Sequence, residues 1–202
     1  MFDKAANPLI AILRGIAPDE AVAVGKELVA AGVSIMEVTM NSPEPLKSIE
    51  LLAEACGADA LVGAGTVLAP AEVEQVARAG GRLVVSPNFD PAVVKATKEQ
   101  GLASVPGCLT PTEMFAALAA GADMLKVFPG DVATPPVIKG YRAVLPKEAK
   151  IAVTGGVNAD NLAAYRQAGA DCFGIGSALY KPGKTAAEVG ESAKEFVAAC
   201  GG

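Results

Sequence analysis

The chain has 202 residues, 51% of them apolar, which suits one domain with a substantial core. Its net charge is −5 and only 4% of its residues are aromatic, which excludes the basic stripe and stacking rings of a nucleic-acid surface. The absence of histidine excludes His-based acid/base catalysis and His-ligated metals. Proton transfer near neutral pH must therefore use a carboxylate, lysine, cysteine or tyrosine with a shifted pKa.

No apolar run reaches the ~18 residues that a membrane span needs. The first residues, MFDKAANPLIAIL, lack the basic, apolar and small-residue order of a signal peptide. We therefore expect a cytoplasmic protein with no membrane segment. The four cysteines are far apart and form no C-x-x-C pair, so we expect buried or incidental thiols. They are Cys56, Cys108, Cys172 and Cys200.

A weak repeat runs along the chain: a segment with helical spacing, then Ala-Gly or a relative, then a short apolar run and a polar loop. The Gly fits the left-handed turn at a helix end. The apolar run shows little alternation, which is typical of a parallel strand covered on both faces. Helix starts are indicated at Pro18, Pro70 and Thr110-Pro111.

Eight strands are predicted, one for each βα unit of ~20–27 residues. Eight units favour a closed (β/α)₈ TIM barrel, an α/β fold, that fills residues 1–202 as a single domain. The rival is an open doubly wound sheet, but G-x-G-x-x-G is absent after the first strand. The predicted strands lie near 9–14, 34–39, 60–65, 82–86, 102–105, 123–128, 150–154 and 171–176.

Active sites of such barrels lie where the strands end and the βα loops begin. Arg14 ends the first predicted strand on the same face as Ile10 and Ile12. A guanidinium there suits a carboxylate or phosphate, because its fork matches two oxygens. A salt bridge at the rim is the structural alternative.

Glu37 and Lys126 are candidates for the chemistry itself. Each is flanked in its strand by apolar residues that can face the helices, so each side chain should point into the barrel. Desolvation there should lower the pKa of Lys126, and a neutral lysine can form an imine with a ketone. Both lie on even-numbered strands, whose side chains share a layer, so Glu37 could serve as acid and base beside the imine. A buried ion pair is the alternative for both.

Two glycine-containing dipeptides, Gly155-Gly156 and Gly176-Ser177, end the seventh and eighth predicted strands. These loops often bind phosphate in barrels, because glycine lets backbone N–H groups approach the anion. Simple tight turns are the alternative. We expect no metal, because Glu37 has no acidic partner at another strand end.

Together these motifs resemble the 2-keto-3-deoxy-6-phosphogluconate and 2-keto-3-deoxy-6-phosphogalactonate aldolases, over nearly the whole chain. The resemblance implies a barrel without cofactor or metal, usually a homotrimer, that yields pyruvate and D-glyceraldehyde 3-phosphate from a phosphorylated keto-deoxy sugar acid. The motifs are LIAILRGI (9–16), EVTMNSP (37–43), GAGTVL (63–68), PGCLTPTE (106–113), LKVFP (125–129), TGGV (154–157) and GIGSALY (174–180).

The resemblance also implies residue roles. Lys126 would form the Schiff base and Glu37 would transfer protons, while Arg14 and Thr66 would bind the carboxylate end of the substrate. Gly156, Gly176 and Ser177, beside Gly155, would bind the distal phosphate.

Two positions bear on the substrate. Asn41 stands where gluconate-type members usually carry arginine and so favours the phosphogalactonate, whereas Thr154 resembles the gluconate type. We therefore predict a phosphogalactonate aldolase, with phosphogluconate or dual use as the alternative. Two further readings stay open: a phosphosugar-binding barrel without chemistry, and a phosphosugar epimerase or isomerase.

Overall fold

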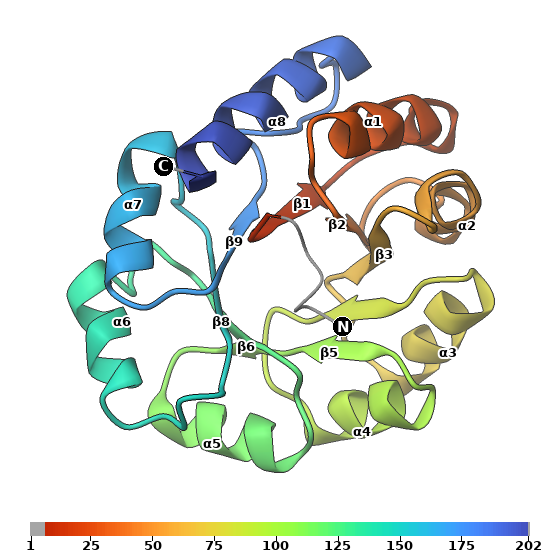
Figure 1. Ribbon diagram of the computed structural model, residues 1–202. Helices are drawn as coiled ribbons and strands as arrows, with labels where there is room; N and C mark the ends of the chain where they lie inside the picture. The colour runs from red at the N-terminus through yellow and green to blue at the C-terminus, as the bar shows by residue number, and fades with distance from the viewer. Residues whose placement is uncertain (1–6, 202) are drawn as a thin grey trace.

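The computed structural model of the chain describes residues 7–201, which form a barrel of parallel strands inside a ring of helices (Figure 1). The predicted barrel is therefore confirmed, and the open sheet was wrong. Residues 1–6, which hold part of the segment read for a signal peptide, lie outside the described residues. The strands are β1 (Leu9–Leu13), β2 (Ile35–Thr39), β3 (Leu61–Gly65), β4 (Leu83–Val85), β5 (Ala103–Val105), β6 (Gly107–Cys108), β7 (Leu125–Val127), β8 (Ile151–Thr154) and β9 (Cys172–Ile175).

The prediction of eight strands was wrong in one place, because the fifth βα unit holds two strands. All neighbours pair in parallel, in the order β5-β4-β3-β2-β1-β9-β8-β7-β6. The two end strands of this sheet, β5 and β6, are consecutive in the chain and are separated only by Pro106. Proline has no N–H to donate to a strand ladder, so the strand breaks there and its two halves pair with different neighbours. β5 pairs with β4 and β6 pairs with β7, so the two ends of the sheet meet at Pro106 and the barrel closes there.

Eight helices cover the barrel, and the first six begin at a proline, whose fixed φ suits the first helical turn. Some starts carry side-chain caps: Thr110 Oγ1 accepts from the N–H of Glu113, which in turn accepts from the N–H of Thr110. The helices are α1 (Pro18–Ala30), α2 (Pro45–Cys56), α3 (Pro70–Arg78), α4 (Pro91–Glu99), α5 (Pro111–Ala119), α6 (Pro135–Arg142), α7 (Ala159–Gln167) and α8 (Ala186–Gly201).

The core has two layers, set by the alternation of strand side chains. The outer layer lies between strands and helices and includes Met36, Val38, Leu125 and Val127. The inner layer fills the barrel with Ile10, Ile35, Leu83, Val85, Ala103, Val105, Met124, Ala152 and Cys172.

All four cysteines are free and buried, as the sequence predicted. In residues 7–201 no helix is long and apolar enough to cross a membrane.

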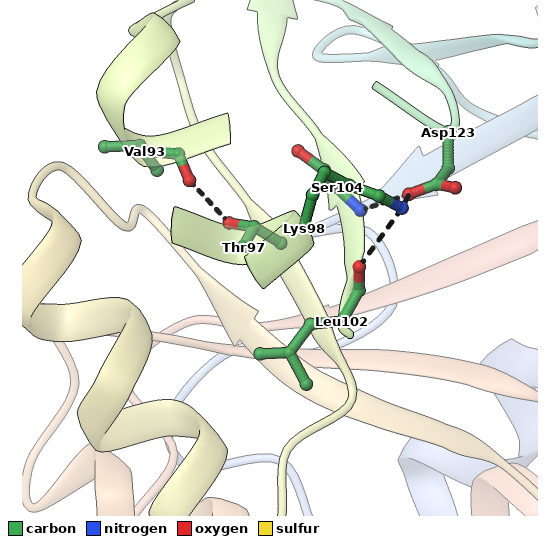
Figure 2. A network of polar contacts seen from close by, with 6 residues as sticks. All are labelled: Val93, Thr97, Lys98, Leu102, Ser104 and Asp123. Carbon is green, nitrogen blue, oxygen red and sulfur yellow. Dashed lines mark hydrogen bonds and ion pairs between the residues drawn. The ribbon is translucent and has the colours of Figure 1, made fainter. Parts of the chain in front are cut away.

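The amino-terminal end of the barrel is held by paired charges (Figure 2). Lys98, near the end of α4, donates to Asp123 Oδ2 at 2.6 Å and to the carbonyl oxygen of Leu102 at 3.4 Å. The same carboxylate oxygen accepts the buried N–H of Ser104 in β5 at 2.8 Å. Asp123 therefore ties α4 and β5 to the start of β7.

Asp123 ends an A-G-A-D sequence at residues 120–123. A second A-G-A-D sequence, at residues 168–171, repeats this arrangement. Asp171, before β9, accepts the N–H of Ile151 in β8 at 2.7 Å and pairs with Arg142 of α6. Arg142 also donates to the carbonyl oxygens of Gly169 and Ala149. In both copies an aspartate before one strand accepts an N–H of the strand in the preceding βα unit, and pairs with a cation from the helix that leads into that earlier strand.

Candidate active site

Two ionisable side chains point into the barrel near its carboxyl-terminal end. Glu37 of β2 is 2% exposed and Lys126 of β7 is 7% exposed. Their flanking residues belong to the outer core layer, so the inward orientation predicted for both is confirmed. Each strand thus carries a charged group in the barrel interior, where charge is costly to bury.

Lys126 lies in a confined but uncrowded position. Its strand neighbours in register are Gly107, which has no side chain, and Ala152, which has only a methyl group. Its Nζ lies 5.0 Å from the centre of the Phe128 ring. Burial lowers the pKa of Lys126, and the nearby Arg14 charge lowers it further, against the opposing effect of Glu37. The lowered pKa favours the neutral amine, which is the nucleophilic form.

Glu37 is perturbed in the opposite direction. Burial raises the pKa of Glu37, although the charges of Lys126 and Arg14 oppose this. Its Oε2 has no hydrogen-bond partner among the residues that the structure describes. Neither a hydrogen bond nor an ion pair joins Glu37 to Lys126 there, so the buried ion pair considered from the sequence is not formed. A carboxyl group with a raised pKa can both give and take a proton near neutral pH.

Arg14 lies in the turn after β1 rather than in the strand, and it is exposed. Its Nη1 donates to Asn41 Oδ1 at 2.8 Å. A second hydrogen bond joins the same two segments, which follow β1 and β2: the N–H of Gly15 donates to Ser42 Oγ at 2.9 Å. Asn41, which the sequence suggested as a substrate contact, therefore contacts Arg14 and holds it at the carboxyl-terminal end of the barrel.

A pocket of about 330 Å³ opens between the ends of β1, β8 and β9. Asn158, in its lining, caps α7 by accepting the N–H groups of Asp160 and Asn161, so a helix N-terminus faces this region. Glycine-rich loops beside a helix N-terminus are a favourable anion site. The lining consists of Ile12, Arg14, Phe128, Thr154, Gly155, Gly156, Val157, Asn158, Gly174, Gly176, Ser177 and Ala178.

The backbone of this pocket has unusual conformations. Gly155 and Gly156 have φ of 94° and 70°, backbone conformations that residues with a side chain rarely adopt. Gly176 differs, because a Cβ there would meet nothing within 4 Å. At the end of β3, Thr66 has φ of 59°, a strained value for a β-branched residue. Such strain is often found at functional sites.

Six predicted site residues line one pocket: Arg14, Thr154, Gly155, Gly156, Gly176 and Ser177. The others, Lys126, Glu37, Thr66 and Asn41, are outside this lining. Phe128 links the two groups, since its ring lies beside Lys126 and also lines the pocket.

Sequence reasoning missed two residues of this region, Phe128 and Asn158. The alternation of strand β7 could have placed Phe128 on the face of Lys126, and Asn158 stands at a helix start where a capping residue is expected. In residues 7–201 no group of three or more Asp, Glu or Cys side chains is arranged to hold a metal ion.

A family model described as KDPG and KHG aldolase matches residues 4–192. Among curated proteins, the chain is 48% identical to the "Probable 2-dehydro-3-deoxy-6-phosphogalactonate aldolase" of Rhizobium meliloti (strain 1021), over 96% of this chain and 91% of the relative. It is 44% identical to the 2-dehydro-3-deoxy-6-phosphogalactonate aldolase of Escherichia coli (strain K12), over 95% of this chain and 94% of that one.

Solved structures show the same likeness. The structure described as native KDPGal superposes with a TM-score of 0.95 at 43% identity, covering 97% of this chain and 95% of the other. The 2-keto-3-deoxy-6-phosphogluconate aldolase of Zymomonas mobilis ATCC 29191 gives a TM-score of 0.86 at 27% identity, covering 96% and 94%.

Proposed function

The chain belongs to the KDPG and KHG aldolase family, and we propose that it cleaves 2-dehydro-3-deoxy-6-phosphogalactonate through a Schiff base on Lys126. The products would be pyruvate and D-glyceraldehyde 3-phosphate. The observation that carries the proposal is the buried Lys126, which forms no ion pair among the described residues 7–201, beside Glu37, at the end of the barrel where catalytic residues gather. As an aldolase the protein is a lyase, which sets aside the binding-only barrel and the isomerase.

In the proposed reaction the neutral amine of Lys126 attacks the C2 ketone, and loss of water from the carbinolamine leaves a protonated imine. Glu37 supplies the proton that leaves with the water and then takes the proton of the C4 hydroxyl. The C3–C4 bond breaks, and its electron pair moves toward the imine to form an enamine. Glyceraldehyde 3-phosphate departs, Glu37 gives the proton that it took from the C4 hydroxyl to C3 of the enamine, and water hydrolyses the resulting imine to pyruvate and the free lysine.

The remaining site residues would hold the two ends of the substrate. Arg14, kept in place by Asn41, would bind the C1 carboxylate, together with Thr66. The 330 Å³ pocket would take the phosphate, on the backbone of Gly155 and Gly156 and beside Ser177. This arrangement would place C2 at Lys126 and the phosphate against the loops after β8 and β9.

The phosphogalactonate is favoured because the relatives at 48% and 44% identity carry that name. A relative named 2-dehydro-3-deoxy-phosphogluconate aldolase, from Treponema pallidum (strain Nichols), is 33% identical over 73% of this chain. Thr154, the gluconate-type feature, supports 2-dehydro-3-deoxy-6-phosphogluconate as a second substrate. The two acids differ in configuration at one carbon.

We also propose that the protein is a homotrimer. The resemblance implies that assembly, and a structure described as a cage made by fusing symmetric oligomeric domains matches 96% of this chain and 72% of the other at a TM-score of 0.94. Several large apolar side chains, among them Phe115, Val132 and Val144, are exposed on the single chain and could be covered by a partner copy. Light scattering in solution tests the mass of the assembly.

The substrate proposal is tested by measuring pyruvate release separately from the two pure acids. We expect a higher kcat/KM with the phosphogalactonate. A higher value with the phosphogluconate would reverse the substrate assignment, and release from neither would contradict the proposed activity.

A further inference from the structure

Strand β3 leaves the barrel interior unusually open beside Glu37. Val62 and Ala64 belong to the outer core layer, so Gly63 and Gly65 face inward, where neither has a side chain. The adjacent strands fill the corresponding interior, β2 with Ile35 and Glu37 and β4 with Leu83 and Val85. Gly65 therefore leaves space on one side of the Glu37 side chain, whereas the place of a Cβ on Gly63 is filled by Leu83 of β4.

The Glu37 carboxyl group occupies that space. A Cβ built on Gly65 would lie 2.4 Å from Glu37 Oε1, 2.6 Å from its Cδ and 3.0 Å from its Oε2. Real Cβ atoms essentially never come this close to another atom, so any side chain at position 65 must displace the carboxyl group. The carboxyl group therefore rests against the backbone of β3.

The backbone does not explain the glycine at position 65. Gly65 is a strand residue, and its φ is outside the left-handed region that favours glycine. Gly63 differs, because a Cβ there would lie 2.0 Å from the carbonyl oxygen of Leu83, in the backbone of β4. Gly63 is thus explained by the packing of two strands, whereas the three atoms nearest to a Cβ on Gly65 all belong to the Glu37 carboxyl group.

Displacement would bring the carboxyl group toward the cations. Glu37 lies on β2, between β3 on one side and β1 on the other. The charged groups that act on it are Lys126 of β7 and Arg14 after β1, while the inner face of β3 carries no charge. Moving away from β3 therefore means moving toward Arg14 and the barrel centre, where Lys126 lies.

We propose that Gly65 is a positioning residue: it gives the Glu37 carboxyl group a place on β3 and so keeps it from pairing with the Lys126 amine. The inference rests on the proposed function, because it matters only if the neutral amine of Lys126 attacks a ketone. An ion pair would hold the amine protonated and would remove the nucleophile that the reaction needs.

The test is the pH dependence of imine formation with pyruvate, measured as the rate of borohydride trapping. An opposite charge at ion-pair distance favours the charged lysine by ~1–3 pH units. In Gly65→Ala we therefore expect the acid limb of the pH–rate profile to move to higher pH by about that amount, with the trapping rate recovered at still higher pH. Gly140→Ala is the control, because a Cβ there, unlike one on Gly65, would meet nothing within 4 Å, and Gly140 lies on helix α6.

A second pair of variants separates positioning from a purely structural role. In a Glu37→Gln background the side chain carries no charge, so adding Gly65→Ala should leave the acid limb where Glu37→Gln alone has it. An equal shift in both backgrounds, or no shift in either, overturns the proposal. If Gly65→Ala does not fold, Gly65→Ala with Glu37→Asp should fold, because the shorter acid leaves the space empty; failure of that double variant also overturns it.

The outcomes distinguish this inference from the proposed function. Absence of trapping in the unchanged protein would contradict the Schiff base itself. Normal trapping in the unchanged protein with an unshifted profile in Gly65→Ala would contradict only the role of Gly65.

Discussion

The two ends of the barrel arrange their ionisable side chains in opposite ways. At the amino-terminal end, Lys98 and Asp123 lie 2.6 Å apart, and the same carboxylate accepts a backbone N–H. At the carboxyl-terminal end, Lys126 and Glu37 are far more buried, yet they form no direct pair. Unpaired buried charges are costly and persist only where the fold holds them in place. The pairing of the polar groups thus separates the end that stabilises the barrel from the end that reacts.

Cavity size alone would indicate the wrong end. A cavity of about 440 Å³, larger than the 330 Å³ pocket, lies near the starts of β2, β7 and β9. Two of its charged lining residues already have partners: Arg166 donates to the carbonyl oxygen of Cys200, and Asp171 pairs with Arg142. The smaller pocket instead offers glycine backbone, an exposed Ser177 and a helix N-terminus.

The largest effect is expected from Glu37→Gln. The amide keeps the size of the side chain but cannot shuttle a proton, so kcat should fall by ~10²–10⁴-fold, as for positioned acid/base groups in general. Pyruvate should still form an imine, more slowly, and exchange of its methyl protons should also slow. Turnover at the unchanged rate would show that another group or water moves the proton, and the contrast between the two ends would lose its functional meaning.

Gly176→Ala tests the phosphate pocket without straining the fold, because its Cβ would meet no protein atom. A methyl group there would obstruct the anion, and loss of a hydrogen bond to a charged group corresponds to ~10–100-fold in binding. We expect KM to rise by about that factor for the phosphorylated substrate and little for its unphosphorylated analogue, with Gly140→Ala as the matched control. Equal losses for both substrates would mean that Gly176 is only a turn.

Asp123→Ala tests the other side of the comparison. It leaves the N–H of Ser104 buried without an acceptor, so the free energy of unfolding should fall by ~1–3 kcal/mol. Lys98→Ala removes the partly exposed ion pair and the 3.4 Å contact of Lys98 with the carbonyl oxygen of Leu102, and should cost ~0.2–1 kcal/mol. Denaturant unfolding measures both, and kcat should be unchanged in each. A large loss of kcat in a folded Asp123→Ala protein would mean that the two ends are not independent.

Asn41→Ala should have a moderate effect on substrate binding. Without Asn41 Oδ1, Arg14 loses the hydrogen bond that holds it over the mouth, so KM should rise by ~2–10-fold with a smaller change in kcat. Asn41→Asp should raise KM further, because the new charge would compete with the substrate carboxylate for Arg14. Steady-state kinetics checks both, and an Asn41→Asp enzyme that binds better than Asn41→Ala would contradict this role.

The smallest effect concerns stability against pH. Because burial raises the pKa of Glu37, the native protein binds this proton more tightly than the unfolded chain does. Stability from this group is therefore fully present below the unfolded pKa and is lost as pH rises from there through the folded pKa. Glu37→Gln escapes that loss, so its melting temperature relative to the unchanged protein should increase with pH above the ordinary glutamate range. A difference that is constant with pH would contradict the raised pKa.

Much of this structure could be predicted from the sequence, because strand alternation determines which face a side chain occupies. It predicted that Lys126 and Glu37 point inward, and the glycine positions after the last two strands predicted the pocket. Alternation does not determine distances, so the missing ion pair and the Arg14–Asn41 hydrogen bond required coordinates. Pro106 is a local reason for a strand to break, but the pairing of the two halves with different neighbours is a tertiary property that no local pattern records.

The most direct test of the account is to reduce the protein with borohydride in the presence of pyruvate and to locate the added mass by peptide mapping. We expect one pyruvate per chain, attached to Lys126, and none in Lys126→Ala, although that variant should fold normally. Addition at another lysine, or equal addition to Lys126→Ala, would contradict the assignment of the unpaired lysine at the carboxyl-terminal end as the nucleophile.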